Sequence, residues 1–156
     1  MSSSSRMGNR TPEPGFTLVE LLIVVAIVGI LAAIAVPNLL NAVDKAKQKR
    51  SMGDIRTIAT AVEAYSTDNA RYPMGVSTWP PLKAILNPHF VKSPPDADAW
   101  AYTWDVGASA GYDYTVASVG KDGAVGPRPG GGTMQFDCDI VFSNGRFFQW
   151  PEGPQS

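Results

Sequence analysis

The sequence predicts an α+β protein, in which one long amino-terminal helix, membrane-spanning in its first half, packs on a small antiparallel β-sheet. Three observations lead to this fold class. An unbroken apolar run covers residues 21–36, an apolar stripe with helical spacing continues to residue 65, and short strand patterns fill the last third of the 156-residue chain. With a net charge of −1, the chain lacks the basic excess typical of nucleic-acid-binding proteins.

We expect three segments along the chain. Residues 1–15 are rich in serine and form a leader that does not join the fold. Residues 16–40 form the membrane half of the helix, because their apolar stretch is long enough for the ~30 Å hydrocarbon core of a bilayer. Residues 41–156 form one globular domain, which includes the second half of the helix.

Glu20 lies just inside the amino-terminal edge of the apolar run. An ionised side chain within hydrocarbon costs roughly 2.5–3.5 kcal/mol on insertion scales, so it needs a partner. No Lys or Arg lies close to it on the helix, which predicts a partner from outside the molecule. Cleavage after Gly15 would supply one, since the new α-ammonium group of Phe16 on a neighbouring copy could pair with Glu20.

Beyond Pro37 the apolar residues recur at steps of three and four, which is typical of one face of an amphipathic helix. We expect the helix to run from Thr17 to about Thr67 and to dock on the globular domain through this stripe. Gly29, Pro37 and Gly53 are candidate positions for a bend. The stripe comprises Leu39, Leu40, Val43, Ala46, Met52, Ile55, Ile58, Ala59, Val62 and Tyr65.

Prolines interrupt residues 68–98, so a short helix from Pro81 to Leu86 is the one regular element expected there. Four later segments are rich in aromatic and β-branched residues and are bounded by Gly, Asp or Asn, as strands are. Asn144-Gly145 between the last two is a strong signal for a type I′ hairpin. The predicted strands are Ala99–Trp104, Tyr112–Ser118, Asp139–Ser143 and Arg146–Trp150.

The segment GFTLVELLIVVAIVGILAAIAVPNLL, from Gly15 to Leu40, resembles the amino terminus of type IV pilins and of type II secretion pseudopilins. The resemblance implies a pilin-like fold, cleavage after Gly15 by a prepilin peptidase, methylation of the new amino-terminal Phe16, and a role for Glu20 in aligning subunits during filament assembly. It implies single-pass insertion in the inner membrane and then a periplasmic or cell-surface filament. The implied partners are other copies of the chain, minor pilins or pseudopilins, and an inner-membrane assembly platform.

A secretory signal peptide is the alternative for the amino-terminal segment. Arg6 and Arg10 would form its charged region, residues 21–32 its apolar region, and Ala33-Ile34-Ala35 its cleavage site. A soluble domain would then begin at Val36. Against this interpretation, a carboxylate lies at the head of the apolar region, and the helical pattern continues in phase through the supposed cleavage site.

A Gly-rich stretch near the carboxyl terminus could hold a metal ion. Ser118 to Gly123, followed by Asp137 and Asp139, gathers hard oxygen ligands that suit calcium. The stretch resembles the calcium loop of major pseudopilins, which implies Asp122, Asp137 and Asp139 as ligands, with the carbonyls of Val119 and Val125 as additions. The longer intervening stretch, Pro127 to Phe136, leaves open which downstream Asp reaches the ion. Aspartates in such a loop are also ordinary turn formers.

The single cysteine, Cys138, excludes an intrachain disulfide. Many type IV pilins carry a cysteine pair in this part of the chain, so its absence favours the pseudopilin branch. We expect a structural subunit of a type II secretion pseudopilus, a filament that drives protein export; the alternative is a major or minor type IV pilin for adhesion, motility or DNA uptake. Neither an enzyme nor a nucleic-acid binder is expected, because the sequence offers no nucleophile with a plausible His base and no aromatic residues interleaved with its basic ones.

Overall fold

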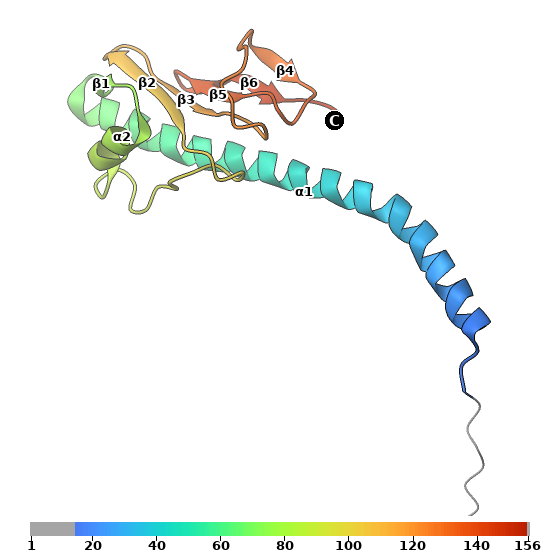
Figure 1. Cartoon of the computed structure of the whole chain (residues 1–156). Coiled ribbons are helices and arrows are strands. Elements are labelled where there is room, and N and C mark those ends of the chain that lie inside the picture. The colour runs from blue at the N-terminus through green and yellow to red at the C-terminus, as the bar shows by residue number, and fades with distance from the viewer. Residues whose placement is uncertain (1–14, 156) are drawn as a thin grey trace, which may run out of the picture. The chain divides into compact units, whose positions relative to one another are not determined.

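The computed structural model describes residues 15–155, so the predicted leader, except for Gly15, lies outside the described residues. The chain divides into two compact units between Asn38 and Leu39. One helix, α1 (Leu18–Asn69), begins in the first unit and continues into the second (Figure 1). The predicted long helix is therefore confirmed to within two residues at each end.

In the first unit, every described residue of α1 is exposed. The apolar window of this helix is long and apolar enough to cross a membrane, and none of it is buried within the molecule. The helical backbone is unbroken at the three candidate bend positions, Gly29, Pro37 and Gly53. A helix that is apolar all round needs lipid or other protein around it, because water does not solvate such a surface favourably.

In the second unit, α1 buries one face whose residues follow each other at steps of four and three. Ile55, Ile58 and Val62 of the predicted stripe are fully buried on this face. The prediction is wrong at the first four residues of the stripe, which are exposed: Leu39, Leu40, Val43 and Ala46. The buried face instead continues towards the amino terminus through polar residues. These polar residues are Asp44, Gln48 and Ser51.

A six-stranded sheet in the order β1-β2-β3-β5-β6-β4 packs with the helices of the second unit. Figure 1 shows the second half of α1 running along one side of the sheet, with α2 near β1 and β2. The expectation of an antiparallel sheet is wrong at one edge, where β4 pairs with β6 in parallel. The long connection from β3 to β5 causes this, because it carries β4 out to the far side of β6. The elements are β1 (Met74–Val76), α2 (Trp79–Leu86), β2 (Asp105–Ala110), β3 (Thr115–Ser118), β4 (Gly131–Thr133), β5 (Ile140–Ser143) and β6 (Arg146–Pro151).

The predicted strand Ala99–Trp104 is wrong. These residues form a turn in which the backbone N–H groups of Trp100 and Tyr102 donate to Asp98 Oδ1 at 3.0 and 2.9 Å. A side chain that bonds nearby backbone groups in this way competes with strand pairing. The strand that does form here is β2, whose sequence DVGASA is too rich in small residues to show a strand pattern.

The predicted carboxyl-terminal hairpin is confirmed. β5 and β6 pair in antiparallel fashion through a turn at Asn144 and Gly145, both with positive φ, of 47° and 83°. Positive φ at both central residues is what a type I′ turn requires, and Asn and Gly tolerate it best. Asn144 has a second task, because its Oδ1 accepts a hydrogen bond from the Tyr114 backbone at 3.0 Å.

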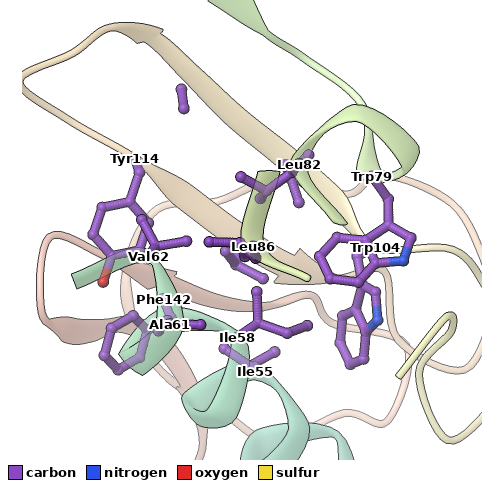
Figure 2. Packing of buried hydrophobic residues seen from close by; sticks show 14 of the residues in the cluster. Ile55, Ile58, Ala61, Val62, Trp79, Leu82, Leu86, Trp104, Tyr114 and Phe142 are labelled. Atoms are coloured by element: carbon purple, nitrogen blue, oxygen red, sulfur yellow. The ribbon is translucent and has the colours of Figure 1, made fainter. Parts of the chain in front are cut away.

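One apolar core joins α1, α2 and the sheet (Figure 2). Burying a large apolar side chain contributes roughly 1.5–3 kcal/mol, so this cluster supplies most of the favourable free energy of folding of the second unit. Trp104 fills the largest volume among the fully buried side chains. The labelled core residues are Ile55, Ile58, Ala61, Val62, Trp79, Leu82, Leu86, Trp104, Tyr114 and Phe142.

Candidate functional site

The predicted processing residues lie immediately before α1. Gly15 and Phe16 are both exposed and outside the helix, and Phe16 is 86% exposed. Neither helical hydrogen bonds nor packing against described residues protects the peptide bond between them. A segment of this kind is accessible to an endopeptidase.

Glu20 forms a capping box with Thr17 at the start of α1. Glu20 Oε2 accepts hydrogen bonds from the Thr17 backbone N–H and from the Thr17 hydroxyl, both at 2.9 Å. The Glu20 backbone N–H donates to Thr17 Oγ1 at 3.2 Å. This reciprocal arrangement satisfies N–H groups that a helix start leaves free. Its sequence signal, a Thr followed three residues later by Glu before an apolar run, was available and was missed.

The expectation that Glu20 finds no partner in its own molecule is therefore wrong for hydrogen bonds. Its charge is a separate matter, because no Lys or Arg among residues 15–155 forms an ion pair with it. The positive end of the helix dipole favours a carboxylate at this position. Burial in hydrocarbon nonetheless still calls for an opposite charge. The role of Glu20 in assembly stays a prediction.

The β3–β5 loop, residues 119–139, contains the five predicted calcium ligands. Asp139 is fully buried, and its Oδ2 accepts a hydrogen bond from Arg128 Nε at 2.7 Å. The backbone N–H of Gly126 lies 3.2 and 3.3 Å from the two carboxylate oxygens of Asp139. Arg128 Nη2 also donates to Asp105 Oδ2, at 2.6 Å. One guanidinium group thus bridges two carboxylates.

Arg128 keeps its positive charge in this environment. Burial by itself lowers the pKa of the guanidinium, and the hydrogen bonds and charges of Asp139 and Asp105 outweigh that effect, so the pKa is raised above its ordinary value. Bonds of this charge-assisted type are about twice as strong as those between neutral groups. The Arg128 guanidinium is therefore the positive charge that balances the buried carboxylate of Asp139.

The other predicted ligands have different surroundings. Asp122 is exposed, and its Oδ1 accepts a hydrogen bond from the Ala124 backbone at 3.1 Å, which closes a turn. Asp137 is also exposed. Val119 is buried, whereas Val125 is 67% exposed.

The structure does not bring the three predicted carboxylates together. Within the part of the chain that the structure describes, no three His, Cys, Asp or Glu side chains are placed to share a metal ion. Calcium takes six to eight oxygen ligands, and the one buried carboxylate of the set, Asp139, is already bonded to an arginine. The donors in this arrangement do not fit a calcium ion. Calcium binding by the chain stays a prediction.

Asp98 is a structural residue that the sequence analysis missed. In addition to its two backbone partners in the turn after it, its Oδ2 accepts a hydrogen bond from the Ser118 hydroxyl at 2.6 Å. The same hydroxyl belongs to the stretch from Ser118 to Gly123 that the sequence predicts to hold calcium. Ser118 therefore fixes the end of β3 to the turn that follows Asp98, and this contact sets the position where the β3–β5 loop begins.

The two ends of the loop approach each other closely at Gly120. Its φ is 74°, and an added Cβ would lie 2.6 Å from the carbonyl oxygen of Asp137. No other residue fits without a shift of backbone.

The loop also contacts α1 and β6. Lys121 reaches Asp44 of α1, with its Nζ 2.8 Å from Oδ2. At the other end, Gln149 Nε2 donates to the carbonyl of Asp139 at 2.9 Å. The loop is thus held by α1 and by β6.

Comparison with known proteins places the chain in a family. Residues 11–36 match the model of the prokaryotic N-terminal methylation motif, and residues 38–135 match that of type II secretion system protein G. The chain is 34% identical to type II secretion system core protein G of Escherichia coli across 73% of this chain and 86% of that protein. It is 35% identical to the core protein G of Pseudomonas aeruginosa, across 73% of this chain and 89% of that protein.

These matches confirm the resemblance that the amino-terminal segment carried, and they favour the pseudopilin branch over the type IV pilins. The exposed apolar helix fits a subunit anchored in the inner membrane. With more than half of its length matched, the chain belongs to the type II secretion system protein G family of pseudopilins.

Proposed function

We propose that this chain is a structural subunit of the pseudopilus, which assembles from the inner membrane into a helical filament that drives protein export. The observation that carries the proposal is the contrast between a second unit with a complete core and an apolar helical segment of which nothing is buried. In a bilayer, lipid covers this segment. In a filament, the same segments of other copies cover it.

Processing precedes assembly in this proposal. A prepilin peptidase cleaves between Gly15 and Phe16, and Phe16 then becomes the methylated amino terminus. The cleavage creates an α-ammonium group at the end of the chain where the capping box holds Glu20. The amino terminus of one subunit can then neutralise Glu20 of another, while an assembly platform extracts subunits from the membrane and minor pseudopilins join the filament.

The substitution Glu20→Gln tests this proposal in the full chain, produced with the other secretion components in a host that lacks its own protein G. Glutamine keeps an oxygen that can accept the capping hydrogen bonds, but it removes the charge. We expect the yield of sheared filaments to fall by about tenfold or more, since 1.4 kcal/mol of pairing energy corresponds to a factor of ten. The matched control is Glu152→Gln at an exposed glutamate outside α1, which should leave the yield unchanged.

Mass spectrometry of the membrane-extracted protein separates processing from assembly. A methylated Phe16 at the amino terminus of both the wild type and Glu20→Gln is expected. A mature chain that begins at Val36 would instead mean a secreted soluble domain. Normal filament yield from Glu20→Gln would show that charge pairing does not drive assembly.

A further inference from the structure

Arg128 lies where the β3–β5 loop brings two carboxylates together. We infer that the guanidinium group of Arg128 is the resident cation of this loop and that it takes the place that the sequence analysis assigned to a calcium ion. The loop is then held together by the chain itself, without a metal. This inference concerns stability of the second unit and is independent of the proposed role in a filament.

The guanidinium group of Arg128 lies between two carboxylates, as a cation that holds them together must. The two donors of Arg128, Nε and Nη2, reach Asp139 and Asp105 at 2.7 and 2.6 Å. Asp105 is the first residue of β2, and Asp139 directly precedes β5, so one side chain links two strands that flank β3. Planar guanidinium groups suit such bridging, because their donors are fixed in direction.

Burial makes the pairing with Asp139 obligatory. The Asp139 side chain is 0% exposed and that of Arg128 is 23% exposed. A carboxylate this deeply buried needs both an opposite charge and hydrogen bonds. Arg128 supplies the charge, and the Gly126 backbone N–H supplies a further bond. Both carboxylate oxygens of Asp139 therefore accept a hydrogen bond from the chain itself.

The same loop disfavours an added divalent ion. Lys121, the second cation of the loop, is already paired with Asp44 at 2.8 Å. The pairing leaves Asp44 unavailable as a ligand, and the remaining aspartates of the loop, Asp122 and Asp137, are exposed rather than gathered around Asp139. A calcium ion at Asp139 would have to displace Arg128 and leave a mostly buried guanidinium group without its strongest partner.

The local sequence supports a dedicated position for Arg128. It stands between Pro127 and Pro129, within the segment Pro127 to Phe136 that makes this loop longer than the calcium loop it resembles. A residue before proline is restricted to extended conformations, and proline itself has a fixed φ. Pro129 therefore limits the backbone freedom of Arg128 in the unfolded chain, which lowers the backbone entropy lost when this segment folds.

The test compares metal dependence with arginine dependence in the full chain, purified in a mild detergent. The apparent midpoint of thermal unfolding is followed by tryptophan fluorescence, in EDTA and in calcium chloride, for the wild type and for Arg128→Gln. We expect the wild-type midpoint to be the same in both solutions. Arg128→Gln should lower it by about 10 °C, as the loss of one partner of a buried ion pair predicts.

The matched control is Arg146→Gln, because Arg146 is exposed and forms no ion pair with residues 15–155. Its midpoint should stay within about 2 °C of the wild type. Where Arg128→Gln does not yield folded protein, Arg128→Lys replaces it: lysine keeps the charge but cannot bridge as a fork, so an intermediate loss is expected. Equilibrium dialysis of the wild type against radioactive calcium adds a direct measurement, with no stoichiometric binding expected.

Two results would overturn the inference. One is a wild-type midpoint that falls in EDTA and recovers in calcium, together with one calcium ion bound per chain. The other is an Arg128→Gln midpoint that equals that of Arg146→Gln. Either would mean that something other than Arg128 holds the β3–β5 loop.

Discussion

The buried face of α1 has a polar half and an apolar half, and the two halves are held against the rest of the second unit by different interactions. In the second unit, α1 buries Ile55, Ile58 and Val62 towards the sheet, and the preceding turns bury Asp44, Gln48 and Ser51 on the same face. The spacing is the same throughout, at steps of four and three residues. The apolar half meets the core of strands and α2, whereas the polar half meets loops and the carboxyl-terminal tail.

Each polar residue in this face has a specific partner. Gln48 Nε2 donates to Gln155 Oε1 at 3.0 Å, and Ser51 Oγ accepts from the Ala99 backbone at 3.1 Å. Asp44 pairs with Lys121 of the β3–β5 loop. Irregular segments carry free backbone and side-chain polar groups, so a helix that covers them must offer hydrogen bonds rather than methyl groups. The difference between the halves therefore reflects what each half covers.

The largest effect is expected in the apolar half. Ile58→Ala removes a fully buried side chain from the centre of the core and leaves a cavity. We expect the free energy of unfolding to fall by about 3–4 kcal/mol, measured by urea titration of the full chain in detergent with tryptophan fluorescence. Thr57→Ala, at an exposed neighbouring position on the same helix, is the control and should change it by less than about 0.5 kcal/mol. Equal effects would mean that this helix face does not carry the fold.

A smaller effect is expected in the polar half. Ser51→Ala removes the acceptor for the Ala99 N–H without a large change in volume. Because that N–H is then left without its partner, we expect a loss of about 1–2 kcal/mol in the same titration. Ser51→Cys, which keeps a weak acceptor in a similar volume, should lie between the wild type and Ser51→Ala. A loss as large as that of Ile58→Ala would remove the distinction between the halves.

Hydropathy predicted the apolar half of this face and could not predict the polar half. From sequence, Leu39, Leu40 and Val43 continue the apolar pattern, yet they are exposed. Steps of four and three residues, counted back from Ile55, do lead to Ser51, Gln48 and Asp44. The burial of these side chains, however, depends on partners more than 45 residues away in the sequence. Tertiary contacts of that kind leave no local signal.

The candidate sites show the same limit. The Thr17–Glu20 capping box is local and could have been found from its spacing. The bridge from Arg128 to Asp139 and Asp105 could not, because aspartates in a Gly-rich loop look alike whether they bind an ion, a turn amide or an arginine. β2 could not be predicted either, because its small residues show no strand pattern. It is paired on both sides, so its stability comes from the neighbouring strands rather than from its own propensity.

The smallest effect on the free energy of unfolding is expected at Asp54. This residue tests whether a polar side chain near the buried face of α1 needs a hydrogen-bond partner. Its Oδ2 is buried without a hydrogen-bond donor among the described residues, and the nearest cation, Arg50 Nε, lies 3.6 Å away. Burial raises the pKa of Asp54, and the charge of Arg50 offsets this only in part. The ionised form is thus less favourable in the folded protein than in the unfolded chain. Stability should therefore be greatest below the unfolded pKa and should fall as the pH rises through the folded pKa.

Asp54→Asn removes that titration while keeping the size of the side chain. At neutral pH the substitution should raise the free energy of unfolding by less than about 1 kcal/mol, because the side chain remains 26% exposed and solvent screens its charge. At about pH 3, where aspartate is protonated in both states, the gain should vanish. Asp113→Asn, at an exposed position outside the helices, is the control and should change the free energy of unfolding by less than about 0.5 kcal/mol at both pH values. A gain that is constant with pH would trace to helix propensity instead, and destabilisation at neutral pH would mean that the pairing with Arg50 outweighs the missing donor.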